Sequence, residues 1–240
     1  MNSHKQLPKC ILKNFSDHGR LFCYDGLKKK YFVTSPNNFN TEENYYSERM
    51  ERQLSQNIEQ PLGVLVAVLK RVFNSSQVLI KKNHSQTIYN YIYALLARSL
   101  NMFMSVYENG TFKKIVALQQ IHDFTVADSF KLMQQDSFLE NYKITFLFND
   151  TDDEILLASD GYTQYQTGQE IFLIVPISPK IAFMLYQGTD IYDGKIVHAN
   201  IEYLSWLNGI TVEQQKQRGQ GCVLASKKEQ LEKVIEREKQ

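Results

Sequence analysis

The sequence predicts an α+β fold in which a helical layer packs on an antiparallel β-meander. Hydrophobic residues recur at helical spacing in the first half of the chain. In the second half, short runs rich in Ile, Leu, Val and Phe follow one another closely. Strands this close together leave no room for crossover helices, so they are expected to pair antiparallel. Helices followed by a run of strands are typical of α+β proteins.

The length and composition indicate a chain that folds on its own. The 240 residues suit a single domain, with a helical part at about 1–135 and a sheet part at about 136–240. Hydrophobic residues make up 43% of the chain, and 14 Phe and 14 Tyr can fill a sizeable core. This composition is far from the low hydrophobicity and high charge of disordered chains.

The first forty residues are expected to hold one short helix or turn and two strands. The helix or turn falls at 5–15, and alternating residues predict strands at 21–24 and 31–34. The stretch DGLKKK is rich in turn-forming residues and joins the two strands. Ser35-Pro36 then breaks the pattern, so a loop is expected there.

The helical layer is predicted from three segments, at 47–73, about 85–107 and about 113–134. In the first segment, one helical face carries apolar residues spaced by three or four: Met50, Leu54, Ile58, Leu62, Leu65, Leu69 and Val72. Pro61 lacks an amide hydrogen, and Gly63 is a weak helix former. The two residues are therefore expected to kink this helix or to split it in two.

The sheet is predicted from four strands, at 143–149, 154–159, 171–177 and 181–187. The turns DTDD, DGYTQYQTGQ and Ser178-Pro179 are expected to separate them. The elements expected after them are a helix at 199–207, a polar helix opened by Thr211, a strand at 222–225 and a helix at 227–239 capped by Ser226.

The net charge of +1 is unevenly spread, which bears on nucleic-acid binding. Residues 1–40 hold seven Lys and Arg against two Asp, whereas residues 134–200 hold ten Asp and Glu against three Lys. Nucleic-acid binders usually carry a basic stripe across the working face, and an acidic stretch would repel phosphate. No tight, sequence-specific DNA binding is therefore expected.

The cysteines and the apolar runs indicate a cytoplasmic protein. Cys10, Cys23 and Cys222 are odd in number and form no C-x-x-C, which argues against a disulfide framework and a thiolate zinc site. The opening MNSHKQLPKC has no apolar core of a secretory signal. The longest apolar run, at 62–69, is far shorter than the about 20 residues that cross a bilayer. A monomeric or weakly associated protein is expected, with no disulfide and no membrane partner.

Common catalytic motifs are absent from the sequence, among them the G-x-x-x-x-G-K-[ST], G-x-G-x-x-G, G-x-S-x-G and H-E-x-x-H patterns. The acidic residues at 150–154 lack the glycine and the distal glutamate of a calcium loop, so no metal site is predicted. His122 and Asp123 point about 100° apart on a helix and are expected to form a surface pair. The cofactor, if there is one, stays unknown at this stage.

Arg98 is the most informative residue of the sequence. It is the only Asp, Glu, Lys or Arg between Lys82 and Glu108, in a predicted helix crowded with apolar and aromatic residues. A partly buried guanidinium is costly unless hydrogen bonds and an opposite charge offset its desolvation. We therefore expect a carboxylate or a bound anion as its partner. A structural salt bridge, a snorkelling side chain and an anion-binding or catalytic Arg all remain open.

Two carboxylates are candidate partners. Glu59 lies just before the Pro61 kink, where its side chain could face a cleft, although an exposed helical Glu is the alternative. Asp160 ends the apolar run ILLAS and precedes Gly161. Carboxylates at strand ends often line sites, but Asp-Gly is also an ordinary turn pair.

Several segments resemble a known family. They are LPKCILKNFSDHGRLFCYD, ENYYSERMERQLSQNIEQ, ALLARSLNMF, LLASDGY and IFLIVPISPKIAFMLY. Together they are similar to the bacterial domain-of-unknown-function family numbered 4238, over roughly residues 4–208. The resemblance places Glu59, Arg98 and Asp160 on family motifs and implies no activity. The chain departs from the motifs where Ser99-Leu100 replaces Thr-Pro and where Tyr162 replaces a Pro.

Three functions follow as hypotheses. The leading one is an intracellular ligand- or anion-binding module, whose pocket between helices and sheet is lined by Glu59, Arg98 and Asp160 and takes a small anionic ligand. The second is a phosphate-ester hydrolase or nuclease-like enzyme, in which the two carboxylates hold a divalent cation while the guanidinium stabilises transition-state charge. The third is a structural ion network without an active site.

Overall fold

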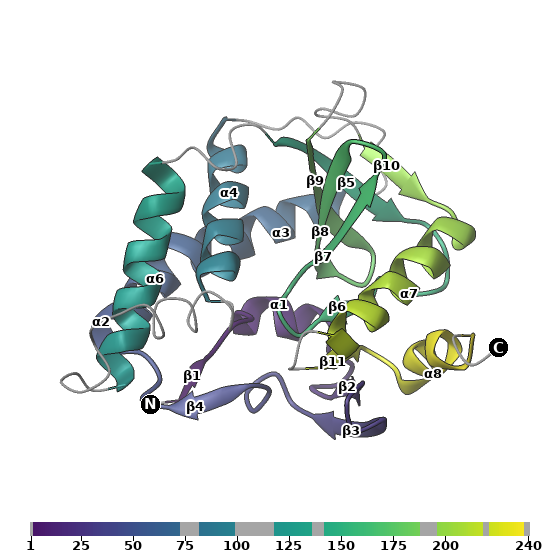
Figure 1. Ribbon diagram of the computed structural model, residues 1–240, viewed down its shortest axis with the longest axis horizontal. Coiled ribbons are helices and arrows are strands. Elements are labelled where there is room, and N and C mark those ends of the chain that lie inside the picture. The colour runs from purple at the N-terminus through teal and green to yellow at the C-terminus, as the bar shows by residue number, and fades with distance from the viewer. Residues whose placement is uncertain are drawn as a thin grey trace.

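The computed structural model describes residues 2–72, 82–98, 118–135, 142–187, 196–217 and 221–237. It has helices and two mostly antiparallel sheets, so the predicted α+β class is confirmed (Figure 1). The parts of the predicted helices at 99–107 and 113–117 lie outside the described residues.

A five-stranded sheet of order β10-β5-β9-β8-β7 separates two groups of helices. Its strands are β5 (Lys143–Asn149), β7 (Thr163–Thr167), β8 (Glu170–Ser178), β9 (Ile181–Gln187) and β10 (Ile196–Ala199). Strands β5, β8 and β9 pair antiparallel, as predicted, and β7, which lies in a stretch expected to be a turn, pairs antiparallel with β8. Strand β10 was not predicted, and it pairs parallel to β5. The central strands are apolar on both faces because both faces are covered.

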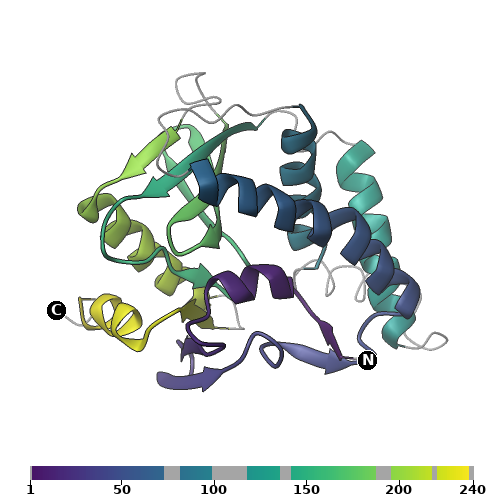
Figure 2. The same cartoon turned by 180° about the vertical axis from the view of Figure 1, so that it is seen from behind.

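Helices of the first half lie on one side of this sheet (Figure 2). They are α1 (Lys9–Asn14), α2 (Glu48–Leu54), the π-helical turn η1 (Ser55–Glu59), α3 (Gln60–Val72), α4 (Lys82–Ala97) and α6 (Leu118–Gln135). Helices α1, α3 and α4 lie beside the sheet, and α2 and α6 lie further out. Their apolar residues share one core with those of β5, β8 and β9. Ser47 begins α2, where its side-chain oxygen accepts a hydrogen bond from the amide of Met50 at 3.2 Å.

The predicted break at Pro61 is a π-helical turn. The amide of Gln60 donates to the carbonyl of Ser55, five residues back, because the helix widens by one residue just before the proline. Widening relieves the clash that a proline ring makes with the carbonyl four residues earlier. Glu59 is the last residue of this turn, and such turns often occur at functional sites.

Helix α7 (Ile201–Gln217) covers the opposite face of the sheet. Its Leu204 and Leu207 pack in a second core with apolar residues of β8 and β9. Two helices were predicted here, but Gly209 lies inside a single helix. A glycine costs a helix only about 1 kcal/mol, which the packing of the whole helix offsets.

A second sheet, of order β3-β2-β11-β6, joins both ends of the chain. Its strands are β2 (Leu21–Asp25), β3 (Lys30–Thr34), β6 (Leu157–Ala158) and β11 (Cys222–Ala225). The strand predicted at 154–159 as part of the meander is therefore shorter than expected and belongs to this second sheet, because it pairs with β11. Helix α8 (Lys228–Arg237) packs on one face of this sheet through Leu231, Val234 and Ile235.

A short two-stranded ribbon precedes α1 and was not predicted. Strand β1 (Asn2–His4) pairs antiparallel with β4 (Thr41–Glu43). The helix or turn predicted at 5–15 is therefore a strap at residues 4–7 followed by α1. Within the described ranges, no helix combines the length and the apolar character that a membrane crossing requires.

Candidate functional site

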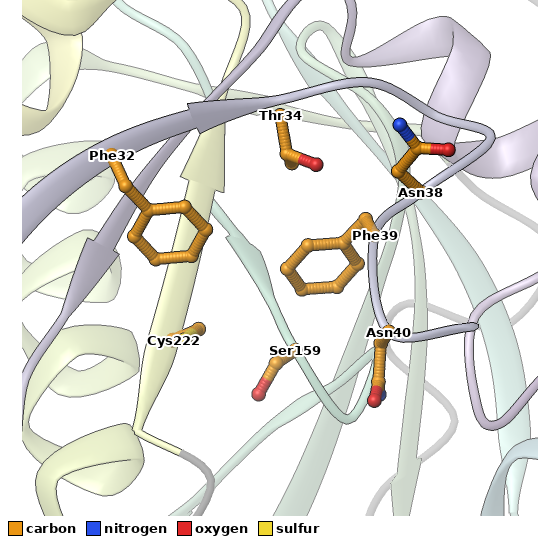
Figure 3. Close-up of a pocket in the computed structure, with 7 residues that line it drawn as sticks. All are labelled: Phe32, Thr34, Asn38, Phe39, Asn40, Ser159 and Cys222. Carbon is orange, nitrogen blue, oxygen red and sulfur yellow. The ribbon is translucent and has the colours of Figure 1, made fainter. Parts of the chain in front are cut away.

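A pocket of about 300 Å³ opens between the second sheet and the loop after β3 (Figure 3). Its walls come from both ends of the chain, and the lining residues are Phe32, Thr34, Asn38, Phe39, Asn40, Ser159 and Cys222. All seven side chains are uncharged: phenyl rings, amides, hydroxyls and a thiol. Pockets of this size that combine aromatic surface with a few polar groups are typical of small-molecule sites.

The first wall of the pocket is held by the strap at residues 4–7. The Nδ1 of His4 donates to the carbonyl of Phe39 at 3.3 Å, and the amide of Lys5 donates to the carbonyl of Asn40 at 3.0 Å. The side-chain amide of Asn40 donates to Oε1 of the buried Gln6 at 3.2 Å. The strap therefore fixes the backbone of two lining residues.

Arg98, which follows the last turn of α4, fixes the strap in turn. Its Nε donates to the carbonyl of Lys5 at 3.2 Å, and a terminal nitrogen donates to the carbonyl of His4. The guanidinium lies 5.5 Å from the ring centre of Tyr46, whose hydroxyl also donates to the carbonyl of Lys5 at 3.1 Å. Another terminal nitrogen lies 3.8 Å from Oε1 of Glu59, so the predicted pairing of Arg98 with a carboxylate is confirmed.

This ion pair stabilises the charged form of Arg98 more than the charged form of Glu59. The Arg98 side chain is 3% exposed, and burial opposes its charge, yet Tyr46 and Glu59 outweigh burial and raise the pKa of Arg98. Burial also raises the pKa of Glu59, and the attraction of Arg98 does not fully reverse this. At 3.8 Å the carboxylate stands beyond hydrogen-bond distance. The backbone carbonyls of the strap are therefore the main partners of the guanidinium.

Two buried polar atoms border this ion pair without a hydrogen-bond partner among the described residues: Oε1 of Glu51 and the hydroxyl of Tyr91. The charge of Glu51 raises the pKa of Glu59 further, and burial raises the pKa of Tyr91 well above its ordinary value. Each unpartnered buried group costs about 1–3 kcal/mol. The hydrogen bonds of Arg98 therefore have to offset the desolvation cost of these two unpaired groups.

The second wall of the pocket is held by Gln215 of α7. Its Oε1 accepts a hydrogen bond from the hydroxyl of Ser159 at 2.8 Å, and its Nε2 donates to Oδ1 of Asp160 at 2.9 Å. The amide of Ser159 donates to the carbonyl of Cys222 at 2.9 Å, which joins two lining residues. Gln215 is buried, so its amide replaces water as the partner of both side chains.

Gly161 lets the turn after Asp160 approach the helical layer. Its backbone φ of +90° lies in a region that residues with a side chain rarely adopt. A Cβ atom here would lie 2.9 Å from Leu95 of α4 and 3.0 Å from Leu7 of the strap. The wall that carries Ser159 thus packs directly against the elements that carry Arg98.

The three residues predicted from the sequence occupy two different places. Glu59 and Arg98 lie together behind the first wall, whereas Asp160 bonds Gln215 behind the second. None of the three is among the residues that line the pocket of Figure 3. The lining residues carry no motif, because they meet only through the pairing of β2 with β11 and the turn after β6.

The cysteines are free thiols. Burial raises the pKa of Cys222, in the pocket, to about 11, and does the same for Cys10. Burial raises the pKa of Cys23 as well. Thiols attack as thiolates, so pKa values this high give no support to a cysteine nucleophile.

Acidic residues of the described part form no group suited to a metal ion. In the cluster at 150–154, Asp150 lies 2.5 Å from Nδ1 of His198, and Asp153 lies 2.6 Å from Nζ of Lys233. The carboxylate of Glu154 accepts from the amide of Ser226 at 2.8 Å. These carboxylates bind protein partners, and their contacts connect the loop after β5 to β10 and to α8.

His122 was expected on the surface and is instead buried, at 6% exposure. Its ring stacks on Tyr45 with centroids 3.7 Å apart, and Asp123 accepts from the amide of Ser47 at 3.0 Å. Adjacent positions on a helix say nothing about what packs across from them, and here α6 packs against the segment before α2. Burial lowers the pKa of His122 to about 4.

The buried His122 predicts a loss of stability in mild acid. The unfolded chain takes up a proton near the ordinary pKa of 6.5, whereas the folded protein does so only near 4. The stabilising contribution of the neutral ring is therefore complete above about pH 6.5 and is lost as the pH falls toward 4. Melting temperatures measured from about pH 7.5 to about pH 5 should fall more steeply for the wild type than for His122→Phe. Parallel pH profiles of the two proteins would contradict this assignment.

The architecture is that of an α+β protein with a helical layer on a mostly antiparallel sheet, and with a second sheet that closes a pocket. The chain belongs to the family described as "Protein of unknown function (DUF4238)", whose model matches residues 6–216. The match begins within the strap, at residue 6, and ends near the end of α7, so it includes Arg98 and Gln215. Comparison with curated proteins and with solved structures gives no match.

Proposed function

We propose that the protein is a binding module that holds a small uncharged ligand in the pocket of Figure 3. The observation that carries this proposal is the pocket of about 300 Å³ with seven uncharged lining residues, whose two walls are each fixed by a buried polar clamp. Fixed walls favour binding, because little conformational entropy is lost when the ligand enters. The free thiols support a reducing, cytoplasmic location.

The lining favours an uncharged ligand over the small anion expected from the sequence. An anion in a confined site requires cationic side chains or several amide N–H groups that point at it. Arg98 could have supplied the positive charge, but its donors are turned to the strap and to Glu59. The hydrolase hypothesis needed Glu59 and Asp160 on one cation, and their observed partners give that arrangement no support.

A pocket-filling substitution tests the proposal. Thr34 lines the pocket from β3, and the next residue back, Val33, points to the other side of the strand and is 54% exposed. A library of small molecules is screened by thermal shift on the wild type, on Thr34→Trp and on Val33→Trp. A ligand at about 100 times its Kd stabilises by about 2.7 kcal/mol, which raises Tm by roughly 5 °C or more.

We expect uncharged compounds to stabilise the wild type and Val33→Trp but not Thr34→Trp. The proposal is wrong if every stabilising compound acts equally on all three proteins. The same outcome would favour the third hypothesis, in which the buried polar groups serve only the fold.

A further inference from the structure

We infer that the ligand is a purine with an amino group at position 6, taken up as the free base or nucleoside. This inference rests on the proposed function and adds the chemical class of the ligand. It follows from three features of the pocket: two aromatic rings, an amide with a free donor and acceptor, and the absence of charge among its lining residues.

The aromatic rings come from opposite sides of the pocket. Phe32 extends from β3 and Phe39 from the loop that follows it, and the two rings point toward one another in Figure 3. Phe32 is 37% exposed, so part of its ring surface is available, whereas Phe39 is 6% exposed and is anchored by the core. A planar heterocycle between them can contact both rings by offset or edge-to-face geometry. Nucleobases stack favourably on aromatic side chains.

The amide of Asn40 supplies the selective contact. One N–H of its side chain is donated to Gln6 at 3.2 Å, which fixes the plane of the amide. The second N–H and the Oδ1 remain for a ligand, and their donor–acceptor spacing matches N7 and the 6-amino group of adenine. The φ of +49° at Asn40 is one that asparagine tolerates better than most residues. Thr34 adds a hydroxyl group for a ring nitrogen or a ribose, and the hydroxyl of Ser159, whose proton is donated to Gln215, can accept from a ribose hydroxyl.

Three nucleosides separate this inference from its alternatives: adenosine, inosine and uridine. Inosine differs from adenosine by an oxo group in place of the amino group, so it presents an acceptor to the acceptor of Asn40. We expect titration calorimetry to give a Kd for adenosine at least about tenfold lower than for inosine or uridine, since one good bidentate base contact is worth about 1–3 kcal/mol.

Two substitutions locate the contacts. Phe32→Leu is expected to raise the Kd for adenosine about tenfold, because base–aromatic stacking contributes about 1–3 kcal/mol. Asn40→Asp keeps the shape of the side chain but removes its N–H donors, so the contact to N7 is lost and the Kd for adenosine should rise about tenfold, while the preference for adenosine over inosine is kept because the acceptor remains. The matched control is Phe124→Leu, at a phenylalanine of α6 that is 44% exposed and outside the pocket. The melting temperature of each variant is recorded, so that a folding defect is recognised.

The inference is overturned if adenosine binds no better than inosine and uridine, or if Phe32→Leu and Phe124→Leu change its Kd equally. The thermal-shift screen distinguishes failure of this inference from failure of the proposed function. If the screen finds uncharged compounds that act on the wild type but not on Thr34→Trp, the pocket binds a ligand of another class. If it finds none, the pocket itself is refuted as a site.

Discussion

Replacing Arg98 with Met is expected to lower the free energy of unfolding by about 3–5 kcal/mol, the usual cost of removing one member of a buried charged network. The substitution removes the donor of the His4 carbonyl, leaves the Lys5 carbonyl with the hydroxyl of Tyr46, and leaves Glu59 without its counter-charge. Chemical denaturation measures the loss directly. A loss below about 1 kcal/mol would show that the guanidinium is not a structural anchor.

An exposed arginine provides the matched control. Arg52 lies 3.6 Å from Glu48 on α2, but its side chain is 74% exposed. Arg52→Met should therefore cost no more than about 0.5 kcal/mol. Glu59→Gln is expected to cost less than about 1 kcal/mol, because burial already disfavours the charge of this carboxylate. In the double variant, Glu59→Gln should restore part of the loss caused by Arg98→Met, since residue 59 then carries no charge that lacks its counter-charge.

Replacing Gln215 with Leu is expected to lower the free energy of unfolding by about 2–4 kcal/mol. Leucine has a similar volume, but it removes the acceptor of the buried Ser159 hydroxyl and one donor to the carboxylate of Asp160. A buried polar group left unpaired costs about 1–3 kcal/mol, and a lost hydrogen bond to a charged group costs about 1.5–3 kcal/mol. Thermal or chemical unfolding measures the change.

Gln217, two residues further along α7, serves as the control for Gln215. It is exposed and donates to Glu213 of the same helix at 3.2 Å. Gln217→Leu should change stability by no more than about 0.5 kcal/mol. Equal effects of the two substitutions would mean that the wall around Ser159 does not depend on Gln215.

The buried charge was predictable from the sequence, whereas its role was not. A lone Arg98 in an apolar stretch had to recover its desolvation energy, which indicated a paired guanidinium, and Pro61 indicated the broken helix that carries Glu59. The carbonyls of His4 and Lys5 could not be foreseen, because any residue offers a carbonyl and the sequence does not mark which ones lie nearby.

The sheets show a similar division. Strands β5, β8 and β9 were predicted because both of their faces are buried and their sequences are apolar throughout. Strand β7 was taken for a turn, since TQYQT is polar and lies at the edge of its sheet. Strand β10 is only four residues long and owes its place to its pairing with β5, a contact far apart in the sequence.

The pocket itself was beyond prediction from the sequence for the same reason. Phe32 and Asn40 lie in the first sixth of the chain, whereas Ser159 and Cys222 follow more than a hundred residues later. Each is an ordinary residue of a strand or loop, and only the joining of β2 with β11 and of β11 with β6 assembles them. His122 escaped prediction likewise, because the ring that buries it belongs to Tyr45.

The central claim is that the buried Arg98 holds one wall of the pocket, and amide hydrogen exchange at Lys5 tests it most directly. This amide donates to the carbonyl of Asn40, so its protection reports the contact between strap and wall. Arg98→Met is compared with Leu231→Ala, a core truncation in α8 that should destabilise the protein by a similar 2–5 kcal/mol, roughly. The account predicts that, under native conditions, the Lys5 amide loses protection in Arg98→Met and keeps more of it in Leu231→Ala. Equal protection of Lys5 in the two variants, at equal global stability, would contradict it.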